Sequence, residues 1–365
     1  MGSPDGAVVT SMETRLLRVP LRRPWGPDVP RVHVIVVEVT TSDGGLGTGF
    51  SWTPTIGARA VQALLDDECA AFVVGGPADP AAVWDGLWRH LHEAGGGGIT
   101  TIAMAGIDLA LWDLHGKRLG ASLVDVLGRR RDFVEVYGSG VNLHYSLDDL
   151  VAQATRWVEA GHGAVKMKVG KPDLDEDIER VAAVREVIGP RRRLMIDANQ
   201  RWDLPTARRA VAALSRFDLY WVEEPLLADA TWAYAQLRAA VDVPIALGEN
   251  AHTIHRFRDL LDAGACDVVQ PNVVRVGGVT PFLRIASLAR TYGVSVAPHL
   301  LPDLSGQLAL CLPDDTLVED VEDASFPALG CLAAPSPVAM SAGRLTADAA
   351  HVGLGLTFRP ATDSE

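Results

Sequence analysis

Three apolar runs that each end in a carboxylate decide the fold of this chain: LMIDAN (194–199), LYWVEEP (219–225) and PIALGEN (244–250). The carboxylates Asp197, Glu223 and Glu249 are each 26 residues apart. About that many residues make one strand, one helix and two loops in a parallel βα architecture. The spacing therefore predicts three successive parallel strands with one acid at the same end of each. A single acid at a strand end is more often a helix cap, but three in the same phase indicate a shared role.

The three carboxylates predict a metal site. Catalytic groups of a parallel barrel gather at the carboxyl ends of its strands, and acids that converge there repel one another unless a cation lies between them. Oxygen ligands favour Mg²⁺, which keeps positions open for water or substrate. We therefore expect one Mg²⁺ per subunit, held by Asp197, Glu223 and Glu249. Strand alternation leaves open whether Glu223 or Glu224 is the middle ligand.

Composition excludes several other classes of protein. The chain has 365 residues, of which 48% are hydrophobic and 22% charged, as in soluble globular proteins of one or two domains. A net charge of −13 argues against a nucleic-acid partner, and no basic run or long apolar segment indicates a membrane. Four scattered cysteines without a CxxC motif indicate buried thiols in a reducing compartment. With no signal-peptide pattern at the start, we expect a cytoplasmic protein.

The order of the elements divides the chain into three parts. Residues 1–125 contain strands followed by helices, which predicts an α+β domain whose first 12 residues are loose. Residues 126–325 alternate strands with helices, so a (β/α) barrel is the economical closure. Residues 326–365 are rich in Pro and Ala, and we expect them to pack back on the first domain. The eight barrel strands are predicted within 134–140, 164–170, 193–199, 219–225, 244–250, 266–272, 294–299 and 316–321.

Two lysines end the second barrel strand. Alternation places Lys166 and Lys168 on the same inward side. Two close ammonium groups lower each other's pKa, and burial lowers it further, so one of them is a candidate general base. The alternative is that both simply balance the charge of the three acids.

Polar residues also end the last three barrel strands. His299 ends the seventh strand, on the far side of the barrel from Lys168, which favours a catalytic role over the structural role of most single histidines. Glu319 lies at the end of the eighth strand, where it either is a structural acid or shares a proton and donates it to a substrate oxygen. Asn272 ends the sixth strand.

Six motifs occur in this order and spacing: KMK, IDAN, WVEEP, ALGEN, RVGG and APH. In combination they resemble the enolase superfamily and, within it, the mandelate racemase subgroup. The resemblance covers most of the chain. It implies an N-terminal capping domain, a (β/α)₇β barrel and a homo-oligomer, which in this subgroup is often an octamer.

The resemblance also implies roles for single residues. Asp197, Glu223 and Glu249 match the Mg²⁺ ligands of the family, and Asn199 matches a position that often touches metal or substrate. Lys168 matches one catalytic base, with Lys166 assisting at the substrate carboxylate. His299 matches the acid/base on the opposite face, and Glu319 matches the group that donates to the enolate side.

One residue departs from the family pattern. The subgroup usually has an Asp where this chain has Asn272. Asn272 can accept a hydrogen bond from Nδ1–H of His299 and fix the tautomer, but it supplies no negative charge. We therefore expect His299 to be a weaker base than in the racemases, which makes the two faces of the site unequal.

The resemblance implies abstraction of the proton α to a carboxylate. Unequal faces favour a one-way reaction, so we expect dehydration of an aldonic or aldaric sugar acid to a 2-keto-3-deoxy acid. The alternatives are racemisation or epimerisation of a 2-hydroxy acid, and a metal-binding homologue that has lost its activity. The partner is a small carboxylic acid in every case.

Substrate specificity is expected to come from loops of the first domain. Arg22 or Arg23 could bind the distal carboxylate of an aldaric acid, and Trp25, Trp52 and Tyr137 are further candidates for substrate contact. The alternative for the arginine-rich loop is a solvated turn with a packed Trp.

Overall fold

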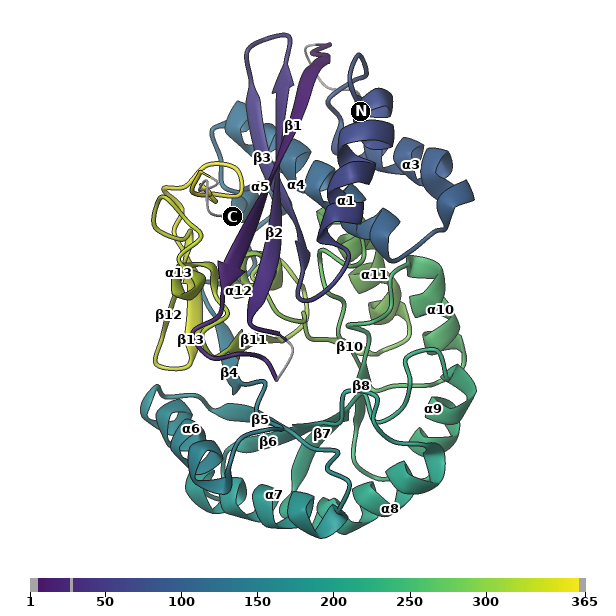
Figure 1. Cartoon of the computed structure of the whole chain (residues 1–365), viewed down its shortest axis with the longest axis vertical. Helices are drawn as coiled ribbons and strands as arrows, with labels where there is room; N and C mark the ends of the chain where they lie inside the picture. The colour runs from purple at the N-terminus through teal and green to yellow at the C-terminus, as the bar shows by residue number, and fades with distance from the viewer. Residues whose placement is uncertain (1–5, 27–28, 361–365) are drawn as a thin grey trace.

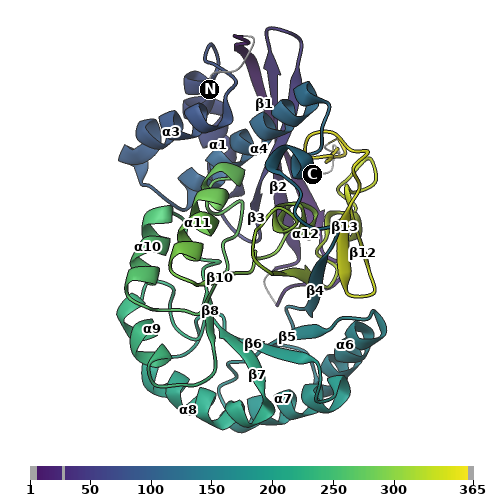
Figure 2. The same cartoon turned by 180° about the vertical axis from the view of Figure 1, so that it is seen from behind.

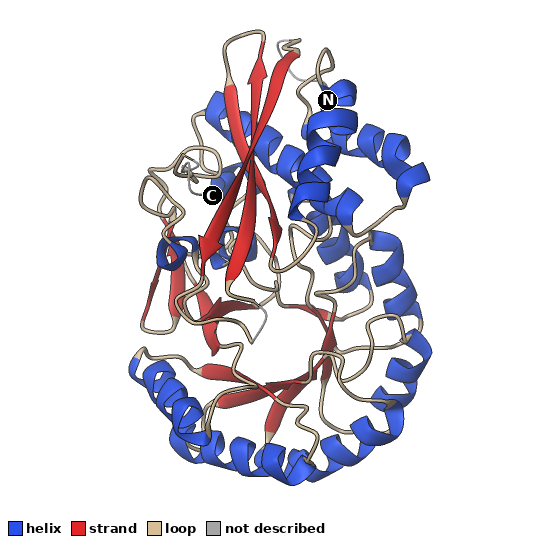
Figure 3. Cartoon of the chain, viewed as in Figure 1, coloured by secondary structure: helices blue, strands red, loops and turns tan. Residues whose placement is uncertain are grey.

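The computed structural model describes residues 6–26 and 29–360. A three-stranded sheet with helices on one side lies above a ring of parallel strands that is surrounded by helices (Figure 1, Figure 3). The predicted fold class, an α+β capping domain followed by a (β/α)₇β barrel, is confirmed. In the described residues no helix combines the length and the apolar character that crossing a bilayer requires.

The capping sheet is an antiparallel meander of β1 (Val9–Pro20), β2 (Arg31–Thr41) and β3 (Leu46–Thr53). Strand β1 begins at Val9, which pairs with Thr41. The prediction of loose residues is therefore wrong from residue 9 onward, because β2 offers a paired edge along almost its whole length. The first five residues lie outside the described part of the chain.

Helices pack on one face of this sheet, and the longest of them comes very close to β3. A Cβ at Gly49 would lie 2.2 Å from the carbonyl oxygen of Gly106, so only glycine permits this approach. The helices are α1 (Ala58–Leu64), the π-helical turn η1 (Leu65–Cys69), α2 (Ala70–Val73), α3 (Pro80–Leu91), the 3₁₀ turn η2 (His92–Ala94), α4 (Ile99–Leu119) and α5 (Leu123–Leu127).

Eight parallel strands form the barrel. They are β4 (Val134–Ser139), β5 (Ala164–Lys168), β6 (Arg193–Asp197), β7 (Leu219–Glu223), β8 (Ile245–Leu247), β9 (Val268–Val269), β10 (Ser295–Val296) and β11 (Leu317–Val321). β11 pairs with β4, and the hydroxyl of Thr316, just before β11, donates to the carbonyl oxygen of Val296 in β10, so the last strand lies between the seventh and the first.

Seven helices follow the first seven strands. They are α6 (Leu147–Glu159), α7 (Leu174–Ile188), α8 (Leu204–Leu214) with the 3₁₀ turn η3 (Ser215–Phe217), α9 (Thr231–Arg238), α10 (Ile254–Asp262), α11 (Val279–Thr291) and α12 (Pro302–Ala309). α6 to α11 form the outer ring, whereas α12, whose residues are all buried, lies beneath the capping domain beside β12 (Val338–Ser341) and β13 (Arg344–Ala347) (Figure 2). Side chains two residues before Ser139, Asp197 and Glu223 form part of a buried cluster: they are Tyr137, Met195 and Trp221. Alternation turns both sets inward, so this cluster fills the barrel beneath the site.

The segment after the barrel contains two strands that the sequence did not indicate. They are β12 (Val338–Ser341) and β13 (Arg344–Ala347), and β13 pairs antiparallel with the outer end of β4. The helical turn α13 (Phe326–Leu329) precedes them. The Phe326 ring lies 5.0 Å from that of Phe50 in β3, and Leu123 donates to the carbonyl oxygen of Gly353. The segment thus contacts both the barrel and the capping domain.

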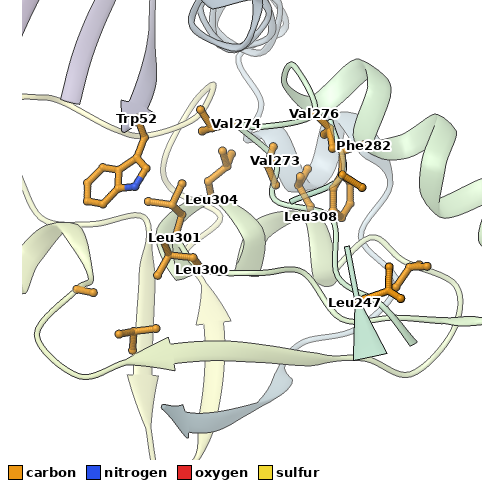
Figure 4. Close-up of a cluster of buried hydrophobic side chains, with 14 of the residues drawn as sticks. Trp52, Leu247, Val273, Val274, Val276, Phe282, Leu300, Leu301, Leu304 and Leu308 are labelled. Atoms are coloured by element: carbon orange, nitrogen blue, oxygen red, sulfur yellow. The ribbon is translucent and has the colours of Figure 1, made fainter. Parts of the chain in front are cut away.

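A buried hydrophobic cluster joins the capping sheet to the barrel loops. Figure 4 shows Trp52, at the lower end of β3, beside the Leu300–Leu301 segment that follows β10, with Val273 and Val274 of the β9–α11 loop nearby. All of these side chains are nearly inaccessible to solvent. The cluster therefore fixes the position of Trp52 over the carboxyl ends of the strands.

Candidate metal and catalytic site

Three carboxylates meet at the carboxyl ends of β6, β7 and β8. The strand register places Lys168 beside Asp197 and Asp197 beside Glu223, and Glu249 follows β8 after Gly248. One oxygen from each of Asp197, Glu223 and Glu249 lies within 4.8 Å of the others, and all three residues are buried. The geometry suits a divalent cation with oxygen ligands.

Glu249 provides a direct test of whether a cation fits this cluster. Its Oε2 atom is buried and accepts no hydrogen bond, although Nε2 of His299 lies 2.9 Å away outside hydrogen-bond geometry. A buried carboxylate oxygen without a hydrogen bond is costly in a folded protein. A cation bound by the three acids would satisfy this oxygen, so the residues present fit a metal.

The other ligand oxygens are oriented by neighbouring donors. The Asn199 backbone N–H donates to Oδ1 of Asp197 at 2.8 Å. The Gln270 amide and the Trp221 indole donate to Oε2 of Glu223 at 2.6 and 3.1 Å. Such donors fix the rotamers of metal ligands.

The structure separates the two adjacent glutamates after β7. Glu223 points into the cluster, whereas Glu224 has a left-handed backbone (φ 37) and turns away. Both oxygens of Glu224 accept from the Asn250 amide, at 3.0 and 2.8 Å. Glu223 therefore belongs to the cluster and Glu224 supports its surroundings.

The two lysines on β5 occupy different places. Lys168 lines the cavity above the carboxylates and its ammonium contacts Asp197. Lys166 is only 1% exposed, and its Nζ lies 2.5 Å from Glu223 and 2.7 Å from Glu319. Lys168 can therefore reach a bound molecule, whereas Lys166 lies beneath the cavity and holds two carboxylates in place.

The expected lowering of the lysine pKa values is not found. Burial does lower the pKa of Lys166, but Glu223 and Glu319 outweigh it and raise that pKa well above its usual range. Burial, the largest single cause, and Lys166 lower the pKa of Lys168, but Asp197, Glu249 and Glu223 together outweigh them and raise it. The prediction gave the repulsion between the lysines more weight than the attraction of the nearby carboxylates, which is larger, so the pKa values agree with the alternative in which the lysines balance the charge of the acids.

Glu319, at the middle of β11, is an acceptor. Its Oε1 accepts from the Ser139 hydroxyl at 2.7 Å, and its Oε2 accepts from the backbone N–H of Leu300 at 3.0 Å. Burial raises its pKa, but Lys166, His299 and Lys168 outweigh burial and lower it to about 2. An ionised Glu319 has no hydrogen to give, so the geometry does not favour the expected donation to a substrate oxygen.

His299 lies just beyond β10 and is held by Asn272. The Asn272 side-chain oxygen accepts from the backbone N–H groups of Val274 and Arg275 at 3.1 and 3.0 Å. Its amide nitrogen therefore faces Nδ1 of His299, 3.0 Å away. The predicted direction of this hydrogen bond is wrong: Asn272 donates, because two backbone donors already occupy its oxygen.

This hydrogen bond fixes the tautomer of His299. Nδ1 accepts from an amide, so in the neutral ring the hydrogen is on Nε2. Nε2 faces the carboxylates, at 2.9 Å from Oε2 of Glu249 and 3.6 Å from Oε2 of Glu319. The ring therefore presents a donor, and no lone pair, to the interior of the site.

A cavity of about 160 Å³ lies between the barrel and the capping domain. Its polar lining comes from the barrel strands and loops and includes Lys168, Asn199, Glu249, Asn272 and His299. Four larger cavities in the described residues, of about 840, 770, 590 and 280 Å³, contain none of the predicted site residues, and the two largest lie at the opposite end of the barrel. We assign the chemistry to the smaller cavity because the ionisable groups converge there.

The predicted substrate residues divide into two groups. Trp25 and Trp52 line the cavity, but Tyr137 is fully buried within the barrel, where its ring packs against Trp221. Arg22 pairs with Asp323 at 3.6 Å and is largely exposed.

Arg23 pairs with Asp149 at 3.0 Å and stacks on Tyr145. Neither arginine lines the cavity.

Sequence reasoning gave no role to four residues that complete the site: Ser139, Asn250, Gln270 and Arg275. Ser139 and Gln270 lie at the carboxyl ends of β4 and β9, in the position that marked the acids. A search for every polar residue at a strand end would have found them. Arg275 donates to the carbonyl oxygen of Glu249 at 2.9 Å from a loop, which no periodic pattern indicates.

The fold and the acid cluster agree with comparisons to known proteins. Residues 8–128 match the mandelate racemase/muconate lactonizing enzyme N-terminal domain, and residues 149–362 match the enolase C-terminal domain-like family. The chain therefore belongs to the mandelate racemase/muconate lactonizing enzyme family of the enolase superfamily, as the motifs indicated.

Several relatives act on acid sugars. The chain is 37% identical to a 3,6-anhydro-alpha-L-galactonate cycloisomerase from Streptomyces coelicolor, over 79% of this chain and 80% of the relative. It is 38% identical to the L-talarate/galactarate dehydratase of Salmonella typhimurium, over 80% and 73%. The crystal structure of an L-talarate dehydratase from Polaromonas sp. JS666 with Mg and L-glucarate superposes with a TM-score of 0.87 at 36% identity, covering 97% and 95% of the two chains.

Proposed function

We propose that this protein is a Mg²⁺-dependent acid-sugar dehydratase. It would remove the proton α to the carboxylate of a sugar acid and expel the β-hydroxyl, giving an enol that becomes a 2-keto-3-deoxy acid. The observation that carries the choice of dehydration is the hydrogen bond from Asn272 to Nδ1 of His299. A ring that presents Nε2–H can donate to a leaving hydroxyl but cannot accept an α proton.

The residues of this chain divide the reaction between them. Asp197, Glu223 and Glu249 would hold Mg²⁺, which supplies positive charge where the substrate carboxylate gains negative charge. Lys168, at the cavity wall, would take the α proton from carbon through its amine form. The charge of Mg²⁺ on Asp197 would favour that form, because it opposes the carboxylate charge that raises the pKa of Lys168. His299 would donate a hydrogen bond from Nε2–H to the β-oxygen as the C–O bond breaks, and the departing hydroxide would take up the proton that Lys168 removed from carbon, so that water leaves.

Three further residues position these groups. Lys166, beneath the cavity, forms an ion pair with Glu319, which lines the cavity, and Lys166 also contacts Glu223. This pair fixes one metal ligand while it balances charge. Asn199 orients Asp197 from the opposite side and also lines the cavity, where it can contact the substrate.

The test is product analysis with a library of mono- and dicarboxylic sugar acids in D₂O. With Mg²⁺ we expect a 2-keto acid from at least one acid, and we expect none after chelation with EDTA. The Lys168→Met variant should lose at least about 100-fold in rate, the usual contribution of a general base. Silence from every acid, with Mg²⁺ still bound in calorimetry, would instead identify a binding protein without activity.

Racemisation or epimerisation is the second candidate. It is favoured by one observation, that Lys168 and His299 line the same cavity from strands on different sides of the barrel. The same D₂O experiment separates the two reactions. An epimer that carries deuterium at the α carbon, without keto acid, would replace dehydration by this alternative.

Two further properties remain predictions. We expect a homo-oligomer, up to an octamer, and exposed apolar side chains such as Trp232 and Leu227 are candidates for its contacts. Analytical ultracentrifugation of the full chain tests this. We also expect a cytoplasmic location, which fractionation of the native host would test.

A further inference from the structure

We infer that the substrate is a compact monocarboxylic acid whose far end is uncharged and accepts a hydrogen bond from Trp52. This inference rests on the proposed function and narrows its substrate class. It comes from the part of the cavity that faces the capping domain. There the lining consists of Trp25, Trp52 and Pro54, so the roof of the cavity is aromatic and apolar.

The roof offers no partner for a second carboxylate. Among the described lining residues the cationic side chains are Lys168 and Arg275, together with the titratable His299, and all come from the barrel. Lys168 contacts Asp197. Arg275 donates to Asn250 at 2.5 Å and lies 3.5 Å from a carboxylate oxygen of Glu249. These charges are directed at the acid cluster.

The two arginines of the capping loop are also engaged elsewhere. Arg22 and Arg23 pair with Asp323 and Asp149, and neither lines the cavity. A distal carboxylate would therefore be buried against indole rings without a counter-charge. Because burying a charge without a partner is strongly unfavourable, a dicarboxylic acid is disfavoured.

The size of the cavity points the same way. Its volume of about 160 Å³ is near the roughly 150 Å³ that holds one benzene molecule. It lies below the roughly 300 Å³ at which typical ligand pockets begin. An acid that fills it is short, or is folded into a ring.

Trp52 indicates one polar contact at the roof. Its side chain is 3% exposed, and its indole nitrogen is buried without a hydrogen-bond partner. Figure 4 shows the nitrogen-bearing edge of the ring turned to the side of Leu300 and Leu301, and Leu300 lines the cavity. A buried donor without a partner is unfavourable in a folded protein. A hydroxyl or ether oxygen of the substrate would satisfy it.

The first experiment compares matched acids. Each aldonic acid is paired with the aldaric acid of the same length and stereochemistry, and kcat/KM is measured with Mg²⁺. We expect the monocarboxylic acid to be favoured at least about 100-fold. Equal or better turnover of the dicarboxylic acid would overturn this inference and leave the proposed dehydration intact.

Binding is measured in parallel, so that the result does not depend on turnover. Calorimetry with the Mg²⁺-loaded Lys168→Met variant should give a Kd at least about 10-fold lower for the better monocarboxylic acid than for its dicarboxylic partner. The reverse order of affinity would refute the inference even if no acid is turned over. If none of the acids is turned over, that result counts against the proposed function and does not affect this inference, which the affinities then decide.

The second experiment tests Trp52. Trp52→Phe keeps an aromatic ring but removes the N–H, so kcat/KM should fall about 10-fold, mainly through KM, for an acid with a distal oxygen. For the analogue that lacks this oxygen the fall should be under about 3-fold. Trp88→Phe is the control, because Trp88 stacks on Trp84 outside the cavity. An equal loss with both acids would show that Trp52 acts only through packing.

Discussion

The direction of one hydrogen bond sets the chemistry of a whole face of the site. Asn272 can donate to His299 only because its oxygen is already bonded to the backbone N–H groups of Val274 and Arg275. A side chain that differs from aspartate by a single group therefore reverses which ring nitrogen carries the hydrogen. The effect requires no change in the position of either residue.

Asn272→Asp should open the His299 face to proton abstraction. One Asp oxygen would keep the two backbone hydrogen bonds, while the other would accept from Nδ1–H, which leaves a lone pair on Nε2. We expect α-deuteration in D₂O from both faces of the substrate, with exchange at the His299 face raised about 100-fold. NMR of the recovered acid and product measures the stereochemistry.

Asn272→Ala is the matched control, since it removes the hydrogen bond without adding an acceptor. It should not produce the second stereoisomer. If Asn272→Asp deuterates one face only, as the parent protein is expected to do, then the tautomer of His299 does not decide the outcome.

The acids were the most predictable residues of the site. Asp197, Glu223 and Glu249 could be predicted because a repeated strand-to-strand distance reports which end of a sheet a residue occupies. The direction of the Asn272 hydrogen bond could not be predicted, since it depends on the backbone of the loop after β9. The ion pairs of Arg22 and Arg23 could not be predicted either, because their partners Asp323 and Asp149 are far away in the sequence.

At the scale of elements, the ends of the barrel strands carry the strained backbone. Left-handed non-glycine residues follow three of these strands: Asn199 and Gln200 after β6, Glu224 after β7, and Leu300 and Leu301 after β10. Such conformations cost about 1–3 kcal/mol each and persist where the surroundings impose them. Here they direct the side chains of the site inward and send the chain outward to the next helix.

Gly248 is the position where this turn allows no side chain. Its φ is 135, and a Cβ would lie 2.8 Å from the backbone nitrogen of Gln270. Gly248→Ala should therefore lower the free energy of unfolding by about 2 kcal/mol or more. It should also weaken Mg²⁺ binding about 10-fold or more, because it displaces Glu249 and the donor Gln270. Urea unfolding and calorimetry measure the two effects.

Gly293→Ala is the control that separates the cost of a positive φ from the cost of a close contact with the added Cβ. Gly293 also has a positive φ (69), but a Cβ there meets nothing within 4 Å. This control should lose about 1 kcal/mol and keep its Mg²⁺ affinity. Equal Mg²⁺ affinities in the two variants would mean that the turn at Gly248 does not position the ligand.

The sequence predicted the lengths of β9 and β10 less accurately than those of the other barrel strands, and it did not predict β12 and β13. β9 and β10 have two residues each, whereas the apolar runs that predicted them are longer. Strand pairing ends at Val269 and Val296, because the chain then turns into the loops that carry Asn272 and His299. β12 and β13 were not predicted because a Pro-rich segment has a weak strand pattern. Their pairing also depends on the start of β4, which β5 leaves unpaired, and this is visible only in the folded structure.

At the scale of the whole molecule, the capping domain is bonded to the loop and helix that follow β9. The indole of Trp84 donates to the carbonyl oxygen of Gly277 at 3.0 Å, and that of Trp112 donates to the Thr280 hydroxyl at 2.9 Å. Asp108 on α4 accepts from the backbone N–H of Thr280 at 3.0 Å. These contacts hold Trp52 above the loops that carry Asn272.

Asp108 makes this junction sensitive to pH. Burial raises its pKa to about 7, although hydrogen bonds from Thr280 and the charge of Arg284 oppose the rise. One of its oxygens has no hydrogen-bond partner. The folded protein therefore holds a proton that the unfolded chain, with an Asp pKa near 3.8, releases above about pH 4. Stability falls as pH rises from about 4 to about 7, and the contribution is then constant.

Asp108→Asn should remove this pH dependence, because the amide is neutral at every pH. The full difference between the two pKa values corresponds to about 4 kcal/mol, of which about 3 kcal/mol lies between pH 5 and pH 8. Urea unfolding at these two pH values should show the parent protein losing that much stability relative to the Asn variant. Parallel stability curves would mean that Asp108 is ionised in the folded protein, and that the contacts of Trp84 and Trp112 hold the junction without it.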